Sequence, residues 1–264
     1  MNIASTILDY LGGHLADFLS KQVKRHDPVT LYDENLLLTV LQPGDIVLIE
    51  GRERVSTAIK YLTQSTWSHA CMFVGDIENP QTGGPLQNSL IEADLKNGVI
   101  ALPLSNYANY NVRIVRPISL LHKDRQTVID FMVASLGKQY DLKNVLDLIR
   151  FAVSTPPVPI RFRRRMLALG SGEPTKAICS TLIAQAFQKV RYPILPLIEE
   201  RADCKCCPDT AREVLHIRHH SLFVPRDFDL SPYFKIIKPG LDEAFDYKAL
   251  VWADQLDEKA QDNE

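Results

Sequence analysis

The sequence lacks any apolar run of the roughly 18 residues that a membrane-spanning helix requires. It also lacks a surplus of either charge, because 30 Lys and Arg residues face 32 Asp and Glu residues and leave a net charge of -2. That balance excludes the overall electrostatic attraction to nucleic acid expected of a basic protein. Residues 1–24 do not show the basic start, compact apolar core and cleavage site of a signal peptide. We therefore expect a cytoplasmic protein that does not bind nucleic acid.

Cysteine is scarce and its number is odd, with five residues at positions 71, 179, 204, 206 and 207. An odd number without a secretory segment favours a reducing compartment and at least one free thiol. With 45% hydrophobic residues in 264, the chain can bury the core of one large domain with elaborations.

Two segments bear on membrane contact. Apolar residues recur at helical spacing in residues 1–24, which predicts a helix packed on the body of the protein, or alternatively an interfacial helix. Residues 161–165 form a basic cluster. A solvated surface is the plainer interpretation of this cluster, and contact with an anionic membrane or an acidic partner is the alternative. Weak peripheral membrane contact is therefore a hypothesis.

Short apolar segments with period two dominate the first half of the chain. They are separated by turn signals such as Asn97-Gly98, and few helical segments lie between them. This succession predicts a mostly antiparallel sheet. Strands are predicted at residues 45–51, 68–75, 89–94, 98–102, 111–116, 221–224 and 233–237, and helices at 56–63, 123–136 and 142–153.

Cys179 lies in the first turn of a predicted amphipathic helix that follows a loop with Gly170, Gly172 and Pro174. The free N–H groups and the positive dipole end of a helix N-terminus favour a thiolate. Cys179 is therefore a candidate nucleophile, and the alternative is a small buried apolar residue.

A histidine and a carboxylate in predicted strands complete a first candidate constellation. A thiol nucleophile needs a base, and the imidazole needs an acceptor that fixes its tautomer. His69 begins an apolar strand, on the face that Cys71 and Phe73 share, and Glu92 lies in another apolar strand. A carboxylate in such a strand should have a partner. The alternative is a satisfied core histidine with an edge glutamate.

A second constellation offers soft ligands to zinc, from three cysteines and three histidines. Cys-Lys-Cys-Cys at 204–207 replaces the Cys-x-x-Cys pair that lets two thiolates converge on one ion. We therefore predict a surface loop and no metal site. The residues concerned are Cys204, Cys206, Cys207, His216, His219 and His220.

Several short blocks, in this order along the chain, resemble the permuted papain-like amidases of the YiiX/YaeF type, which are circularly permuted relatives of the NlpC-type peptidases. They are Leu41-Gln42-Pro43-Gly44-Asp45-Ile46-Val47-Leu48, Trp67-Ser68-His69-Ala70-Cys71-Met72-Phe73-Val74-Gly75, Glu92-Ala93, Gly98-Val99, Gly137-Lys138-Gln139-Tyr140-Asp141 and Ile178-Cys179-Ser180. The resemblance implies Cys179 as nucleophile, His69 as general base and Glu92 as the orienting residue. We further expect Ser68, Tyr140 and Ser180 to contact the substrate.

These observations predict an α+β papain-like fold, with an antiparallel, barrel-like sheet packed against the Cys179 helix. The expected organisation is an N-terminal helical extension (1–40), a catalytic domain (41–237) and a C-terminal extension with a polar tail (238–264).

The predicted function is a cysteine-dependent hydrolase that cleaves an amide or ester bond through a thioester acyl-enzyme, without a cofactor. A small molecule, a peptide or a lipid-like compound would carry that bond. The first alternative is a lipid acyltransferase or thioesterase, because the lecithin:retinol acyltransferase group is a related permuted fold. The second is a non-catalytic binding module.

Overall fold

The computed structural model describes residue 21 and residues 34–80, 83–94, 97–139, 178–200 and 213–239. Apart from residue 21, the predictions for residues 1–24, 142–153 and 161–165 lie outside these ranges, and so do Tyr140 and the three clustered cysteines at 204, 206 and 207. Within the described ranges, no helix has the length and apolarity that a membrane span requires.

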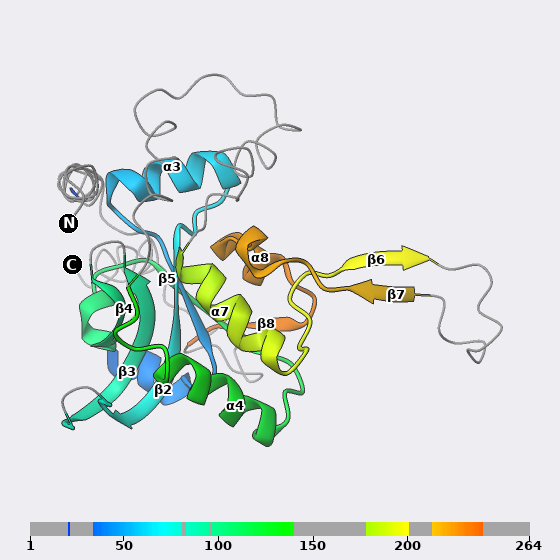
Figure 1. Ribbon diagram of the computed structural model, residues 1–264. Helices are drawn as coiled ribbons and strands as arrows, with labels where there is room; N and C mark the ends of the chain where they lie inside the picture. The colour runs from blue at the N-terminus through cyan, green and yellow to red at the C-terminus, as the bar shows by residue number, and fades with distance from the viewer. Residues whose placement is uncertain are drawn as a thin grey trace, which may run out of the picture.

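A six-stranded antiparallel sheet forms the centre of the molecule (Figure 1). Its strands follow the order β4-β3-β2-β1-β5-β8. All four residues of β1 are hydrophobic and buried, because both faces of the sheet are covered at this central strand. The bounds are β1 (Ile46–Ile49), β2 (His69–Glu78), β3 (Pro85–Asp94), β4 (Gly98–Pro103), β5 (Val112–Pro117) and β8 (Phe234–Ile237).

The predicted α+β class and antiparallel sheet are confirmed, but the barrel-like closure is wrong. The sheet is open, with β4 at one edge and β8 at the other. Closure would require these two edge strands to pair with each other, and the described part of the chain instead pairs β8 with β5 and β4 with β3.

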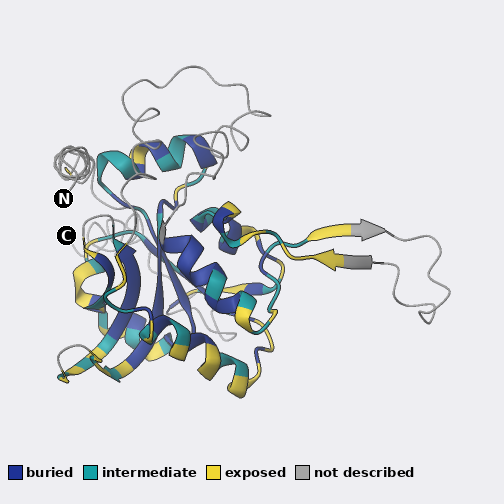
Figure 2. Cartoon of the chain, in the orientation of Figure 1, coloured by how far each residue is buried: buried dark blue, intermediate teal, exposed yellow. Residues whose placement is uncertain are grey.

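Two helices, α4 (His122–Val133) and α7 (Ile178–Lys189), cover one face of the sheet (Figure 1). Leu182, Ile183 and Phe187 of α7 are almost fully buried against Ala70 and Met72 of β2. Figure 2 shows the central strands and the first turns of α7 in the colour of buried residues. The helix that bears Cys179 therefore packs against the sheet, as the sequence predicts.

The opposite face of the sheet has its own core cluster. Cys71 and Phe73 of β2 point to this side, together with Val47 and Leu90 of the neighbouring strands. The predicted alternation along β2 is thus confirmed. Leu37 of α2 (Glu34–Val40) is 3% exposed and packs on the same cluster.

Gly98 begins β4 at the turn that Asn97-Gly98 predicts. Its φ of +72° lies in the left-handed region, and a Cβ atom there would stand 2.3 Å from the carbonyl oxygen of Lys138. The backbone of Val99 donates to that same oxygen at 2.9 Å. Glycine therefore allows the chain after α4 to lie directly against the start of β4.

The C-terminal part departs most from the prediction. The predicted strand at 221–224 is wrong, because a 3-10 turn, η2 (His220–Leu222), takes up its first residues and the helix α8 (Pro225–Leu230) begins directly after it. Pro225 stands at the helix start, where its missing N–H costs nothing.

A two-stranded ribbon of β6 (Leu197–Glu200) and β7 (Glu213–His216) projects from the body (Figure 1). The remaining elements are α3 (Arg54–Thr63) and the 3-10 turn η1 (Leu104–Tyr107).

Candidate active site

His69 and Glu92 meet across the pair of strands β2 and β3. The register pairs Met72 with Ile91, so one step further along the ladder Glu92 stands beside Cys71. The Nε2 atom of His69 lies 2.9 Å from Oε2 of Glu92. The side chain of Glu92 is 7% exposed and that of His69 is 22% exposed, so the contact is largely shielded from water.

Cys179 is the second residue of α7 and lies at the buried start of this helix. Burial by itself would raise the pKa of its thiol, but the charge of His69 and a hydrogen bond with that ring lower it below its ordinary value. Backbone N–H groups of Ala70 and Ser180 lower the pKa further. The surroundings of Cys179 therefore favour a thiolate.

The two nitrogen atoms of His69 have different partners. Nε2 faces Glu92, which leaves Nδ1 for the hydrogen bond with Cys179. Burial opposes the charged ring, yet the negative charges of Glu92 and Cys179 outweigh it and raise the pKa of His69 well above its ordinary value. The arrangement thus favours an imidazolium between two anions.

One oxygen atom of Glu92, Oε2, contacts three other side chains of the site. Oε2 accepts a hydrogen bond from Sγ of Cys71 at 2.8 Å and from the hydroxyl of Tyr107 at 2.5 Å, in addition to its contact with His69. Burial opposes ionisation of this carboxyl, but His69 and the three hydrogen bonds lower its pKa to about 2. Glu92 is consequently an anion held in one orientation.

Tyr107 and Cys71 are members of this cluster that the sequence analysis does not assign to the site. Burial, together with the neighbouring anions, raises the pKa of both the Tyr107 hydroxyl and the Cys71 thiol, so both remain hydrogen-bond donors. A sequence signal exists for Cys71, which shares the His69 face of its strand by period two. Tyr107 lies on η1, beyond β4, where no local pattern indicates it.

The three residues predicted to contact the substrate are Ser68, Ser180 and Tyr140, and the structure describes the first two of them. The hydroxyl of Ser68 is buried and accepts a hydrogen bond from the N–H of Gly51 at 2.9 Å. Ser180 is fully buried, and its backbone N–H faces the Cys179 sulfur. Tyr140 lies outside the described residues. Their substrate roles therefore stay predictions.

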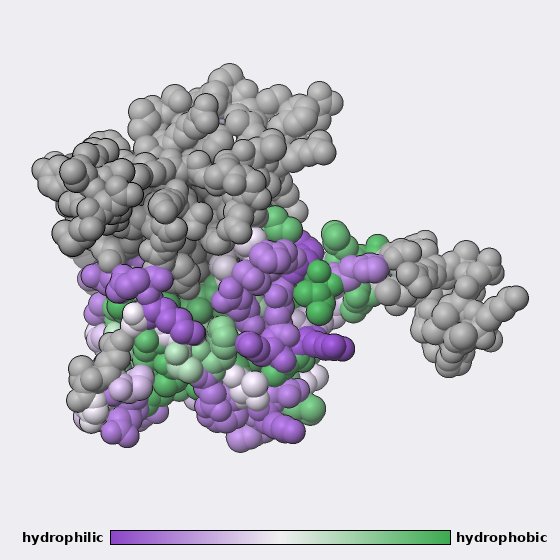
Figure 3. Space-filling model, viewed as in Figure 1, coloured by the Kyte–Doolittle hydropathy of each residue, from purple (hydrophilic) through white to green (hydrophobic). Residues whose placement is uncertain are grey.

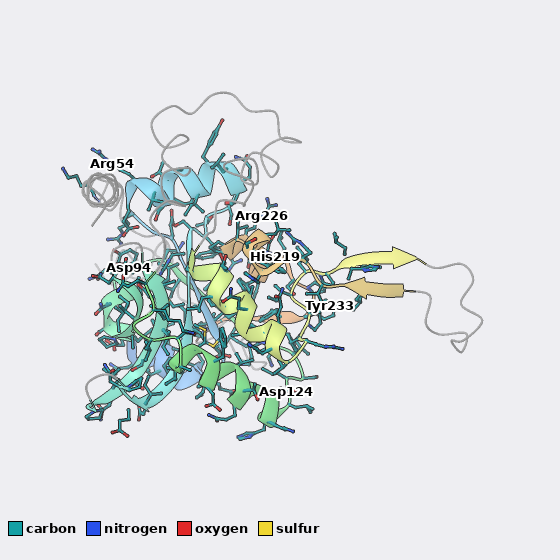
Figure 4. The ribbon with its side chains drawn as sticks, in the orientation of Figure 1. Arg54, Asp94, Asp124, His219, Arg226 and Tyr233 are labelled. Atoms are coloured by element: carbon teal, nitrogen blue, oxygen red, sulfur yellow. The ribbon has the colours of Figure 1, made fainter. Side chains whose placement is uncertain are left out.

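Asp94, the acidic neighbour of Glu92, belongs to the turn at the end of β3 (Figure 4). Its Oδ1 atom accepts hydrogen bonds at 2.8 Å from both the backbone N–H and the side-chain amide of Asn97. Glu92, and not Asp94, is thus the carboxylate beside His69.

The histidines of the second constellation show no common ligand position among the described residues. His219, labelled in Figure 4, contacts the Ser221 hydroxyl through Nδ1 at 2.7 Å. The ring centroids of His219 and His220 lie 4.1 Å apart with the rings tilted by 36°, and Gln185 lies beside His220. A different set of atoms could hold a metal ion, namely the side chains of His69, Cys71 and Glu92.

A fold that sets a thiol at a helix N-terminus, beside a histidine and a carboxylate on adjacent strands, is arranged as in papain-like cysteine hydrolases. Residues 40–148 match the family model described as "Permuted papain-like amidase enzyme, YaeF/YiiX, C92 family". The resemblance predicted from the sequence is thereby confirmed over this stretch, which includes His69, Glu92 and Tyr107 but ends before Cys179.

No curated protein matches the chain significantly. Among solved structures, the chain is similar to the metalloprotein yiiX from Escherichia coli O157:H7, with a TM-score of 0.43 and 16% identity. The alignment covers 75% of this chain and 97% of that one.

Proposed function

We propose that this protein is a cysteine-dependent hydrolase that cleaves an amide or ester bond through a thioester acyl-enzyme. The observation that carries the proposal is the placement of His69 between the Cys179 thiol and the Glu92 carboxylate. The match of residues 40–148 to a family of permuted papain-like amidases supports the same class of reaction.

In the first half of the reaction, the Cys179 thiolate attacks the carbonyl carbon of the substrate and forms a carbon–sulfur bond. Backbone N–H groups in the first turn of α7, at the positive end of the helix dipole, are suited to the oxyanion that develops. His69 then gives its Nδ1 proton to the leaving amine or alcohol, as the carbon–nitrogen or carbon–oxygen bond breaks. The thioester on Cys179 is the product of this half.

In the second half, His69 is neutral and accepts a proton from water as the water oxygen attacks the thioester carbonyl. The carbon–sulfur bond breaks, the carboxylic acid leaves and the thiolate–imidazolium pair is restored. Glu92 stays ionised throughout and holds the ring through Nε2, the role of the orienting residue in Cys-His systems.

Acyl adducts provide the experiment that tests this function. We would incubate the protein with p-nitrophenyl esters of short and long acyl chains and measure the intact mass after rapid acid quenching. The expected result is one acyl group on Cys179, absent from Cys179→Ser and strongly reduced in His69→Ala. Absence of an adduct on Cys179 with every ester, or equal acylation of all cysteines, would contradict the proposal.

A lipid-like substrate is a second candidate, favoured by the ribbon of β6 and β7. Apolar side chains of the ribbon and its base are exposed to between 45% and 63%, and Figure 3 shows apolar residues where the ribbon leaves the body. An enzyme that meets its substrate at a lipid surface would use such residues for contact. The residues are Leu197, Ile198, Leu215 and Ile217.

Co-sedimentation with phosphatidylcholine vesicles tests this second candidate. The double variant Ile198→Ser/Leu215→Ser should bind less than the parent protein, while a surface change on α4 such as Gln126→Ser should have no effect. Equal binding of both variants and the parent, or no binding by any of them, would remove the case for a lipid substrate.

A further inference from the structure

The side of His69 that faces away from Cys179 presents a compact set of metal-ligand atoms. Nε2 of His69, Sγ of Cys71 and a carboxylate oxygen of Glu92 all lie within 4.8 Å of one another. Oε2 of Glu92 is 2.9 Å from Nε2 and 2.8 Å from Sγ. Ligands of a tetrahedral zinc ion, bound at about 2.0–2.3 Å, are separated by roughly 3.3–3.7 Å. A shift of less than about 1 Å would therefore open the set around such an ion.

We propose that His69, Cys71 and Glu92 form a binding site for one thiophilic divalent cation of the zinc class. This departs from the absence of a metal that the sequence predicts. Imidazole, thiolate and carboxylate are the three ligand types that zinc accepts in proteins. Calcium and magnesium, which take oxygen ligands, do not fit this set.

Charge favours the site despite its burial. Cys71 is fully buried and Glu92 is 6% exposed, so an uncompensated ion would be strongly disfavoured here. A divalent cation, one thiolate, one carboxylate and one neutral imidazole sum to zero. To bind the ion, the Cys71 thiol and Nε2 of the charged His69 ring each release a proton to solvent. The hydrogen bond from Sγ to Glu92 is then replaced by one bond from Sγ to the metal ion and one from Glu92 to the metal ion.

Solvent and a further oxygen atom lie beside the three ligand residues. The His69 side chain is 22% exposed, whereas that of Glu92 is 7% exposed, so the cluster is open to water on the histidine side. The Tyr107 hydroxyl, 2.5 Å from Oε2 of Glu92, is a further oxygen atom next to these ligand atoms. Cys179 uses the other side of the ring and is not a ligand.

Metal binding and acyl transfer would exclude each other at this site. With the ion on Nε2, His69 retains only its Nδ1 proton and no longer forms the imidazolium that protonates a leaving group. This consequence rests on the proposed function, but the metal site itself stands on the ligand geometry alone.

Cobalt(II) spectroscopy tests the site without any substrate. The parent for the experiment is the full chain with Cys204, Cys206 and Cys207 changed to Ser, which leaves Cys71 and Cys179 as the remaining thiols. A thiolate bound to cobalt gives a near-ultraviolet charge-transfer band, whereas histidines alone do not. We expect the band to saturate at one equivalent of cobalt and to disappear when zinc is added.

Two serine variants locate the ligand. Cys179→Ser should keep the band and Cys71→Ser should lose it, although serine retains a donor to Glu92 and nearly the same volume. Glu92→Gln, as a second variant, should keep the band but lower the cobalt affinity by on the order of tenfold or more. No band in the parent, or a band lost in Cys179→Ser and kept in Cys71→Ser, would overturn the proposal. The acyl-adduct experiment is independent of either result.

Discussion

Oε2 of Glu92 accepts from the ring of His69, the thiol of Cys71 and the hydroxyl of Tyr107, so that one carboxylate oxygen connects β2, β3 and η1. This oxygen stabilises the positive charge on His69, and His69 in turn lowers the pKa of the Cys179 thiol. A change at Glu92 should therefore be detected at Cys179, although no direct contact between them is needed.

The first prediction is that Glu92→Gln slows alkylation of Cys179 by iodoacetamide at pH 6. Without the carboxylate charge, burial dominates at His69 and its pKa falls, so Cys179 loses the charge that holds its thiolate. An opposite charge at this distance shifts a pKa by about 1–3 units, so the rate should drop on the order of tenfold or more.

The matched control is Asp94→Asn, two residues along the same strand. Its side chain would still accept the hydrogen bonds from Asn97, and the labelling rate should stay at the parent value. Peptide mass spectrometry gives the rate at each cysteine. Equal slowing by both changes would show that Glu92 has no special relation to His69.

The second prediction concerns stability. Tyr107→Phe keeps the ring that packs edge-on against Tyr110 at 5.3 Å and removes only the donor to Glu92. A hydrogen bond to a buried charge contributes about 1.5–3 kcal/mol, and the free energy of unfolding at pH 7 should fall by about that amount.

Urea unfolding measures this loss, with Tyr110→Phe as the control, for which we expect a change within about 0.5 kcal/mol. Because Glu92 stays ionised at pH 7 without Tyr107, labelling of Cys179 should remain near the parent rate. A Tyr107→Phe protein as stable as the parent would mean that the short contact with Glu92 does not stabilise the fold.

The third prediction is a pH profile. The lowered pKa of Cys179 means that its thiolate is present above that pKa and is lost as the pH falls through it. The raised pKa of His69 means that the imidazolium is present below that pKa and is lost as the pH rises through it. Hydrolysis of the esters above should therefore be bell-shaped, while alkylation of Cys179 should show only the acid limb.

His69→Ala should move the acid limb of alkylation upward, because burial then raises the pKa of Cys179 without opposition. Cys71 provides the internal control: its pKa is raised by burial and by Glu92, and it should stay unlabelled near neutral pH. If the acid limb of Cys179 alkylation stayed at the same pH in His69→Ala, His69 would not control the pKa of Cys179.

Much of the sheet and the site could be predicted, because their signals are local. Alternation along residues 68–75 assigns each side chain to a face, and His69 and Glu92 are unusual residues in otherwise apolar strands. Cys179 is indicated by its place at a helix start. For these residues, spacing and polarity carry the information.

Other features depend on contacts that are distant in the sequence. Whether β4 and β8 close a barrel depends on the twist and pairing of the whole sheet, which no single strand encodes. The ribbon of β6 and β7 joins segments separated by residues 201–212, and Tyr107 reaches Glu92 only because η1 returns over β3. The false strand at 221–224 arose from apolar residues such as Phe223, which is buried and has an extended backbone but lies between η2 and α8 and not in a strand of the described sheet.

The last prediction tests the ion pair that anchors β1 to β5. Arg116 contacts Asp45 through two bonds, Nε to Oδ1 at 2.8 Å and Nη2 to Oδ2 at 2.7 Å, and Asp45 is only 1% exposed. Arg116→Ala leaves that carboxylate buried without its cation, which costs about 3–5 kcal/mol. Urea unfolding should show a loss of this size.

Arg113, on the same strand, supplies the comparison. Its side chain is 38% exposed, pairs with Asp229 at 2.7 Å and covers the ring of Trp67. Exposed pairs and cation–π contacts each contribute about 1 kcal/mol or less, so Arg113→Ala should cost about 1–2 kcal/mol. If the two variants lost equal stability, burial of Asp45 would not be the reason for the cost at Arg116. Because neither arginine contacts Cys179, His69 or Glu92, the labelling rate of Cys179 in each folded variant should match that of the parent.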